Sequence, residues 1–230
     1  GLGSFGLTLN NNTIAGNALL QPSSNITDCV KLLASDGQAN DQFGRSVSLD
    51  GDYCIVGAFL EDAKGSDAGA AYVFRRTGTN TWDAGVKLVA PDGQAGDRFG
   101  WSVSLNGDYA IVGAPNEDAK GSSAGAAYIF RRTGTNTWDA GVKLVASDGQ
   151  GNDQFGISVS LNGDYAIVGA FLEDTKGSNA GAAYVFRRTG TNTWDTGTKI
   201  TAPDGQANDQ FGRSVSLSSC YAIVGAPLED

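Results

Sequence analysis

Four copies of one pattern, spaced 56 residues apart, constrain this chain more than any other feature of its sequence. Each copy opens with Phe-Gly, passes through Ser-Val-Ser-Leu and a tight turn, and continues into Tyr-x-Ile-Val-Gly-Ala. Residues 43–90 and 99–146 are identical at 41 of 48 aligned positions. A fixed period of this size indicates a repeat architecture. The opening pairs are Phe43-Gly44, Phe99-Gly100, Phe155-Gly156 and Phe211-Gly212.

Each repeat contains four runs with strand character, which we label strands A to D. In the first complete repeat, the turn Asp50-Gly51 joins strand A (Ser46–Leu49) to strand B (Tyr53–Ala58) and is a strong β-hairpin signal. Strand C is Gly69–Arg76, and strand D runs over about 82–90. Four antiparallel strands in one repeat predict a blade of a β-propeller. A stacked solenoid is the competing repeat architecture.

Composition narrows the classes of function. The 230-residue chain has a net charge of −9, a pI near 4.4 and no histidine. We expect no nucleic-acid partner, because phosphates are bound by Lys and Arg. The absence of histidine removes the commonest general base and metal ligand. The sequence also has no nucleophile motif, so we expect a protein that is not an enzyme and has no cofactor.

No run of about 20 apolar residues is present, so we expect no membrane span. The sequence starts at Gly1 and contains no methionine. We therefore expect a processed or trimmed chain from which an export signal has been removed.

The run from Phe-Gly to Ile-Val-Gly-Ala-Pro resembles the FG-GAP repeat of integrin alpha-chain β-propellers. It is complete at 99–115 and 211–227, whereas Phe59 and Phe171 replace the proline in the other two copies. The chain is still more similar to bacterial and protist FG-GAP repeat proteins, which carry a Gly-Ala-Ala-Tyr-Val-Phe strand like 69–74. The resemblance covers about residues 28–230 and implies an all-β propeller of four-stranded antiparallel blades.

The calcium sites of that family are not carried over to this chain. Integrin-type blades often place an Asp-x-Asp-x-Asp-Gly loop between strands A and B, where this chain has two-residue turns such as Asn106-Gly107. Ca²⁺ takes six to eight oxygen ligands, which so short a turn cannot supply. We expect no built metal site, and weak Ca²⁺ binding by the acidic loops stays an open alternative.

The two ends of the chain are expected to build the last blade together. The fourth repeat has only strands A and B, whereas 30–32 repeats strand D at the other end of the sequence. We expect residues 1–29 to be the closing segment of a single domain with the repeats of 30–230, and Phe5–Leu9 or Thr13–Leu20 to substitute for strand C. Three outcomes stay open: a four-bladed monomer, completion of a neighbour's blade by the N-terminal strands, and a fragment of a seven-bladed propeller.

The cysteines and the glycosylation motifs fall where the repeat breaks. Cys220 replaces the aspartate of the A–B turn, and Cys29 stands at the start of a strand D on the same rim of the last blade. We predict a Cys29–Cys220 disulfide, with three free thiols in a reducing compartment as the alternative. Cys54 occupies an alanine position of strand B and is predicted to be a small buried residue. Asn11 and Asn25 begin glycosylation motifs.

Antiparallel strand order places the B–C and D–A loops on one rim and the A–B and C–D turns on the other. We predict an acidic first rim and, because of the paired arginines that end strand C, a more basic second rim. In integrins, which the chain resembles, the first rim binds ligand; a solvated rim without a ligand is the alternative. The candidate contact residues are Glu61, Asp62, Asp67, Trp101, Glu117, Asp118, Glu173 and Asp174.

Two kinds of tryptophan position are distinguished. The recurring Trp82, Trp138 and Trp194 are predicted to pack within the blades. The position after Phe-Gly varies and includes Trp101, which we expect to be exposed as a contact anchor; packing drift would explain the variation equally well. The residues at this position are Arg45, Trp101, Ile157 and Arg213.

Two functions follow from these observations. The first is an extracellular or cell-surface module for protein binding or adhesion, with the acidic rim as its contact face. The alternative is a structural subunit of a surface assembly or filament, a homo-oligomer in which N-terminal strands are exchanged between copies.

Overall fold

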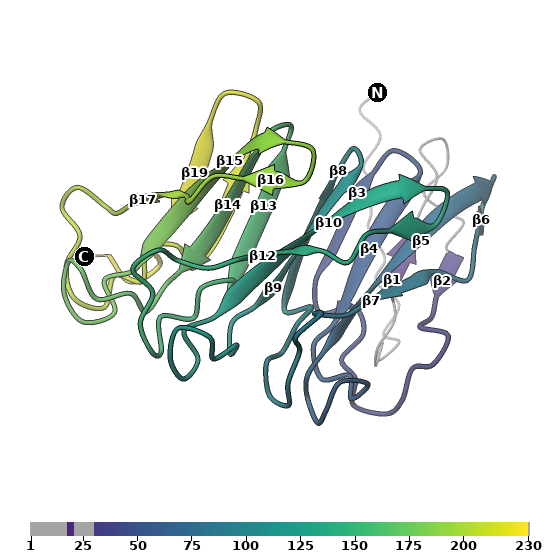
Figure 1. The fold of residues 1–230 in the computed structure, drawn as a ribbon, viewed down its shortest axis with the longest axis horizontal. Helices are drawn as coiled ribbons and strands as arrows, with labels where there is room; N and C mark the ends of the chain where they lie inside the picture. Colours follow the sequence, from purple (N-terminus) through teal and green to yellow (C-terminus); the bar gives the residue numbers. More distant parts are fainter. Residues whose placement is uncertain (1–17, 21–29, 230) are drawn as a thin grey trace, which may run out of the picture.

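The structure is a computed structural model that describes residues 18–20 and 30–229. All regular elements in these residues are β-strands, which confirms the all-β prediction. Three consecutive repeats each form one antiparallel sheet, and we call these sheets blades 1 to 3 (Figure 1). A two-stranded half-blade stands at either end of this row.

The strand bounds repeat from blade to blade. Blade 1 contains β3 (Val47–Asp50), β4 (Tyr53–Ala58), β5 (Ala70–Gly78), β6 (Thr81–Trp82) and β7 (Val86–Leu88). Blade 2 contains β8 (Ser102–Asn106), β9 (Tyr109–Ala114), β10 (Ala126–Gly134), β11 (Thr137–Trp138) and β12 (Val142–Leu144). Blade 3 contains β13 (Ser158–Asn162), β14 (Tyr165–Ala170), β15 (Ala182–Gly190), β16 (Thr193–Trp194) and β17 (Thr198–Ile200). The half-blades are β1 (Ala18–Leu20) with β2 (Val30–Leu32), and β18 (Ser214–Leu217) with β19 (Ala222–Gly225).

Strand B lies in the middle of each blade, as its apolar sequence predicts. In blade 1, β4 pairs with β3 on one side and with β5 on the other, in antiparallel register throughout. Five of its six residues are buried. A strand that is covered on both faces needs apolar side chains at successive positions, and Cys54-Ile55-Val56 supplies them.

Strand D is divided in every blade, which the sequence did not predict. In blade 1, β6 and β7 both pair with β5, and the register shifts between Arg76 and Gly78. The break forms because Asp83 Oδ1 accepts the backbone N–H groups of Arg75 and Gly85, at 3.0 and 3.1 Å. Gly85 has a φ of 78°, and a Cβ there would lie 2.6 Å from the Phe74 ring. Only glycine fits this corner without strain.

The core consists of layers between neighbouring blades. Phe99 is fully buried and packs edge-to-face on Tyr128 and Phe130, with ring centroids 5.6 and 5.9 Å apart. Trp138 and Trp194 pack, partly buried, against these layers, in agreement with the predicted packing role. The first strands of successive repeats also contact one another: β3 lies on β8, β8 on β13 and β13 on β18. The blades are therefore arranged around a common axis, as in a propeller.

The two half-blades lie at opposite ends of the molecule (Figure 1). β1 pairs with β2 in the register that strands C and D have in the complete blades, so Ala18 faces Leu32 as Ala71 faces Leu88. Among the described residues, β19 has β18 as its only strand neighbour. The completion of the last blade by the N-terminal segment therefore stays a prediction.

Candidate functional site

The B–C and D–A loops meet on one rim, and we call this surface the loop rim. It comprises the B–C loops 59–69, 115–125 and 171–181, and the D–A loops 33–45, 89–101, 145–157 and 201–213. Each B–C loop hydrogen-bonds to the D–A loop that follows it, as in the N–H of Gly96 to the carbonyl of Ser66 at 2.9 Å. Gly69 and Phe99 continue this contact as an isolated β-bridge. The loops are thus joined in pairs around the rim.

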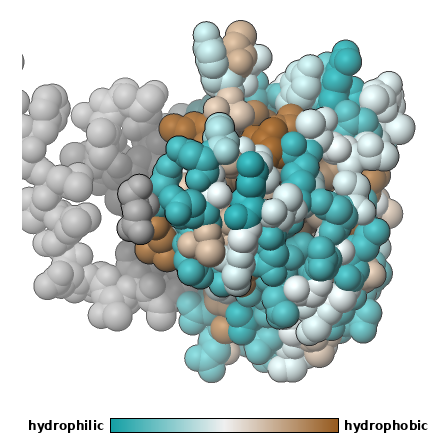
Figure 2. Space-filling model, turned by 90° about the vertical axis from the view of Figure 1, so that its left-hand side faces the viewer, coloured by the Kyte–Doolittle hydropathy of each residue, from teal (hydrophilic) through white to brown (hydrophobic). Residues whose placement is uncertain are grey.

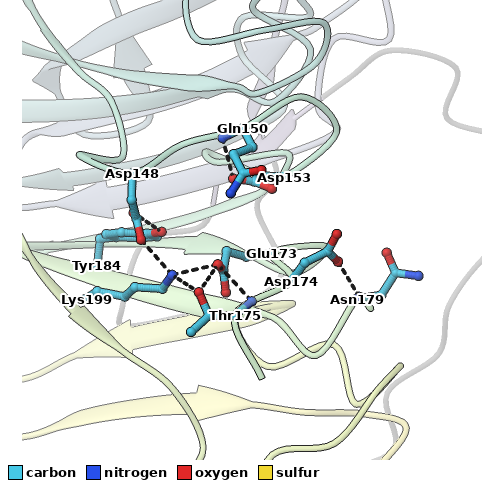
Figure 3. Close-up of polar contacts among 9 residues, drawn as sticks. All are labelled: Asp148, Gln150, Asp153, Glu173, Asp174, Thr175, Asn179, Tyr184 and Lys199. Carbon is cyan, nitrogen blue, oxygen red and sulfur yellow. Dashed lines mark hydrogen bonds and ion pairs between the residues drawn. The ribbon is translucent and has the colours of Figure 1, made fainter. Parts of the chain in front are cut away.

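A cluster of four polar side chains joins each D–A loop to the B–C loop that follows it. In blade 3, Lys199 Nζ donates to Glu173 Oε1 at 2.6 Å and to Asp148 Oδ2 at 2.8 Å, and Tyr184 Oη donates to Asp148 Oδ1 at 2.8 Å (Figure 3). Glu173 is 4% exposed, and its carboxylate also accepts the backbone N–H of Thr175. The equivalent clusters are Asp36, Glu61, Tyr72 and Lys87 in blade 1 and Asp92, Glu117, Tyr128 and Lys143 in blade 2.

The hydrogen bonds of each cluster shift the pKa values of its lysine and its aspartate in opposite directions. Burial lowers the pKa of Lys143, but its hydrogen bonds to Asp92 and Glu117 outweigh burial and raise that pKa above its ordinary value. Burial also raises the pKa of Asp92, and its bonds to Lys143 and Tyr128 reverse the effect and lower it. Glu61, Glu117 and Glu173 were predicted as contact residues of the rim. They are instead buried ion-pair partners within the fold.

A further carboxyl group is buried at the base of each D–A loop. Asp97 Oδ2 accepts the backbone N–H of Gln94 at 2.7 Å, and Asp153 accepts that of Gln150 in the same way. Burial raises the pKa of both to about 6, and the nearby carboxylates of the B–C loops add to the shift. The Asp-Gly-Gln-x-x-Asp motif is thus a turn closed by its own last side chain, as Figure 3 shows for Asp153 and Gln150.

The outer surface of the loop rim carries a second set of aspartates. Asp62, Asp118 and Asp174 are exposed, one in each B–C loop. Asp62 Oδ1 accepts the backbone N–H of Asp67 at 2.9 Å, across a turn in which Asp67 has a φ of 56°. Asp67 itself is half-buried. The three exposed carboxylates therefore have fixed positions on an otherwise solvent-facing surface.

The variable position after Phe-Gly lines the axis of the molecule. A hollow of about 310 Å³ lies between the first strands of the four repeats. Trp101 is half-buried there and not fully exposed, and its role as a contact anchor stays a prediction. Its ring packs edge-to-face on Phe59 with centroids 4.8 Å apart, and the guanidinium of Arg45 lies 4.9 Å from it. The residues of the variable position in this hollow are Arg45, Trp101, Ile157 and Arg213.

The FG-GAP repeat family matches the chain four times, at residues 26–74, 82–130, 138–186 and 194–230. The chain belongs to the FG-GAP repeat family. Each FG-GAP repeat begins near strand D of one blade and reaches into the next blade, so each match spans an interface between blades. No curated protein matches the chain.

The opposite rim of this FG-GAP protein is less basic than the sequence predicts. The second arginine of each pair binds the aspartate of the A–B turn, as Arg76 Nε does to Asp52 Oδ1 at 2.8 Å. Arg132 also donates to Tyr53 Oη of the preceding blade at 2.9 Å, and its guanidinium lies 4.2 Å from that ring. These arginines are therefore neutralised and take part in packing between blades. The equivalent ion pairs are Arg132–Asp108 and Arg188–Asp164.

The cysteines of the FG-GAP repeats do not form the predicted bond. Cys220 is an exposed free thiol in the β18–β19 hairpin. Cys54 is buried as predicted, and burial raises its pKa to about 12. Cys29 and the glycosylation candidates Asn11 and Asn25 lie outside the described residues.

Within residues 18–20 and 30–229, no group of three or more His, Cys, Asp or Glu side chains is arranged to hold a metal ion. The same residues include no helix with the length and apolar character needed to cross a membrane.

Proposed function

We propose that this FG-GAP protein is a non-enzymatic binding module, extracellular or on a cell surface, that contacts a protein partner through its loop rim. The observation that carries the proposal is that some rim carboxylates are buried in ion pairs whereas their neighbours are exposed. Buried Glu117 and its cluster hold the loop, while Asp118, the next residue, is exposed. A surface that is rigid before binding loses little conformational entropy when a partner docks.

The charges of the rim favour a basic partner. The chain carries a net charge of −9, and the exposed aspartates recur at the same place in each blade. Complementary charge accelerates association and selects against wrong partners more than it adds affinity. We therefore propose that the protein partner, in binding or in adhesion, has a contact surface rich in lysine or arginine.

The repetition of the rim supports binding rather than catalysis. The same carboxylates, lysines and tyrosines occur in three successive clusters with the same hydrogen bonds. A catalytic centre normally needs titratable groups in environments that differ from one another. Three equivalent clusters whose charges are paired internally instead suit a scaffold.

The test compares two triple variants with the same change in net charge. One variant carries Asp62→Asn, Asp118→Asn and Asp174→Asn on the loop rim, where the amide oxygen still accepts the loop N–H. The control carries Asp52→Asn, Asp108→Asn and Asp164→Asn on the opposite rim. The probe is a lysine-rich peptide, with binding measured by calorimetry at low and at physiological salt.

We expect the rim variant alone to weaken peptide binding by about tenfold. Three exposed charges contribute about 0.5 kcal/mol each, and 1.4 kcal/mol corresponds to a factor of ten. Equal weakening in both variants would show that only the net charge matters, and it would refute the proposal. Absence of binding to the unchanged protein would do the same.

The open half-blades favour a second candidate function, that of a structural subunit in a surface assembly. β19 exposes an unpaired edge among the described residues, and unpaired edges are sites of association with other chains. The location outside the cell is common to both proposals. It is tested by finding the protein in the culture medium, or by digestion of intact cells with protease.

A further inference from the structure

The interfaces between blades are copies of one another. In blade 1, Ile55 of strand B is buried in the same layer as Val103 and Leu105, which come from strand A of blade 2. In blade 2, Ile111 is buried in the same way with Val159 and Leu161 of blade 3. None of these six residues is more than 8% exposed. At each interface, the isoleucine of strand B in one blade thus packs with the valine and the leucine of strand A in the next blade.

The two ends of the molecule expose the two halves of this same contact. Ile223 of β19, the equivalent of Ile55, is 71% exposed. Val47 and Leu49 of β3, the equivalents of Val103 and Leu105, are 60% and 58% exposed. Apolar side chains reach the surface at the β18–β19 end, where they appear in brown among hydrophilic residues (Figure 2). We call the surface of Ile223 the tail face and that of Val47 and Leu49 the head face.

The polar groups at the two ends are also matched. Within the chain, Ser48 Oγ accepts the backbone N–H of Leu105 at 3.0 Å, and Ser160 Oγ accepts that of Leu217 at 3.0 Å. The equivalent hydroxyl on the tail face belongs to Ser216, and the equivalent N–H on the head face belongs to Leu49. Docking of the two faces would therefore pair the N–H of Leu49 in one copy with the hydroxyl of Ser216 in the other. The equivalent groups are already paired at the internal interfaces.

The backbone of the tail face leaves room for the next blade. A Cβ at Gly57 would lie 2.0 Å from the carbonyl oxygen of Gly100, so the two backbones are in direct contact at this interface. Gly113 and Gly169 meet the carbonyls of Gly156 and Gly212 in the same way. At Gly225 the three nearest atoms all belong to Ser214 of its own hairpin. The tail face therefore has the glycine that the contact requires, and no blade of the described residues lies against it.

The half-blades complement each other in register. β18 and β19 supply strands A and B, and β1 and β2 supply strands C and D, each pair with the register of a complete blade. In blade 1, Gly57 pairs with Ala71, and Val56 with Tyr72. The same register would pair Gly225 with Ala18 and Val224 with Leu19.

We propose that the tail face of this chain docks on the head face of a second copy, so that β19 of one copy and β1 of the other complete a four-stranded blade. A second copy fits better than the same copy, because Val47, Leu49 and Ile223 all stay exposed within one chain. Because the internal interfaces are alike, a docked copy would continue with the same rotation from one blade to the next. The proposal rests on the second candidate function, assembly through the open half-blades, and is independent of what the loop rim binds.

The proposal has a geometric consequence for the size of the assembly. Each copy supplies three blades and two halves. Two copies contribute eight blades, which lies at the upper end of the usual range for a closed propeller. Head-to-tail contacts end in a ring when the rotation closes and in a filament when it does not. We expect the assembly mass to be twice the chain mass of 23.7 kDa, or a higher multiple.

The test uses one blocked face at a time. Val47→Asp places a charge on the head face, and Ile223→Asp places one on the tail face. Because both residues are exposed within a single chain, the substitutions leave its own core intact. Thr135→Asp, in an exposed turn of blade 2, is the charge-matched control. Mass is measured by light scattering after size-exclusion chromatography.

We expect the unchanged protein and Thr135→Asp to run as multiples of the chain, and each blocked variant to run as a single chain. A mixture of the two blocked variants retains one good head face and one good tail face. It should therefore form a one-to-one pair and grow no further. A monomeric unchanged protein, or a mixture that does not pair, would overturn the proposal; a compact monomer would indicate closure within one chain instead.

Discussion

Removal of one cation from a loop-rim cluster is the most direct test of how the fold is held together. Lys143→Met keeps most of the aliphatic stem of the side chain and removes the charge. Glu117, whose side chain is 7% exposed, then has no cation to balance it, and Asp92 loses the same partner. The remaining hydrogen bond from the N–H of Ala119 to Glu117 does not neutralise a carboxylate.

The magnitude follows from the burial of the pair. Breaking a fully buried ion pair by removing one partner costs about 3–5 kcal/mol. The Lys143 side chain is 24% exposed, so water partly replaces the lost partner, and we expect a loss of about 2–3 kcal/mol. For a domain of this length that corresponds to a fall in Tm of roughly 4–12 °C.

The assay is urea unfolding at pH 7, followed by circular dichroism, with Arg76→Met as control. Arg76 and Asp52 form an ion pair whose side chains are 51% and 57% exposed, and such pairs contribute at most about 1 kcal/mol. The double variant Glu117→Gln with Lys143→Met should recover part of the loss, because it removes the unpaired charge. If Lys143→Met costs no more than Arg76→Met, the buried clusters do not hold the rim.

Three further predictions concern single side chains. Asp97→Asn should stabilise the fold by on the order of 1 kcal/mol at pH 8 and not at pH 4. The carboxyl has a folded pKa of about 6, so the fold loses stability as pH rises through that value, and the amide avoids the loss; an equal effect at both pH values in urea unfolding would contradict this reasoning. Gly85→Ala should cost more than about 2 kcal/mol, because its Cβ would lie 2.6 Å from the Phe74 ring. Gly51→Ala, which has a φ of 56° but no atom within 4 Å, should cost only about 1 kcal/mol, and similar losses in thermal unfolding would refute the steric explanation. In the folded protein a thiol reagent should modify Cys220 at once and Cys54 only after unfolding, and prompt modification of both would contradict the buried position of Cys54.

The repeat predicted the blades because it combines two local signals. The hairpin turn fixes the pairing of strands A and B, and the apolar run fixes strand B in the middle of the sheet. Strand B was predicted at Tyr53–Ala58 and is found at the same residues. The break in strand D was missed, because it depends on Asp83 reaching back to the N–H of Arg75, eight residues earlier.

The rim was predicted less well, because charge in a sequence does not reveal burial. Glu61 and Asp62 are adjacent and chemically alike, yet one is buried and the other is exposed. Lys87, which binds Glu61, lies 26 residues away, on β7. The recurrence of Glu, Tyr, Lys and Asp at fixed places in every repeat was the available signal. On the opposite rim, the pairing of Arg76 with Asp52 across the blade was missed for the same reason.

The offset between FG-GAP repeats and blades bears on how such a protein changes in length. One repeat, such as 82–130, contains the closing strand of one blade and the opening strands of the next. Gain or loss of a 56-residue unit in the gene therefore adds or deletes a complete junction and leaves both terminal surfaces as they were. A change by whole units would therefore alter the number of blades and keep the same two end surfaces.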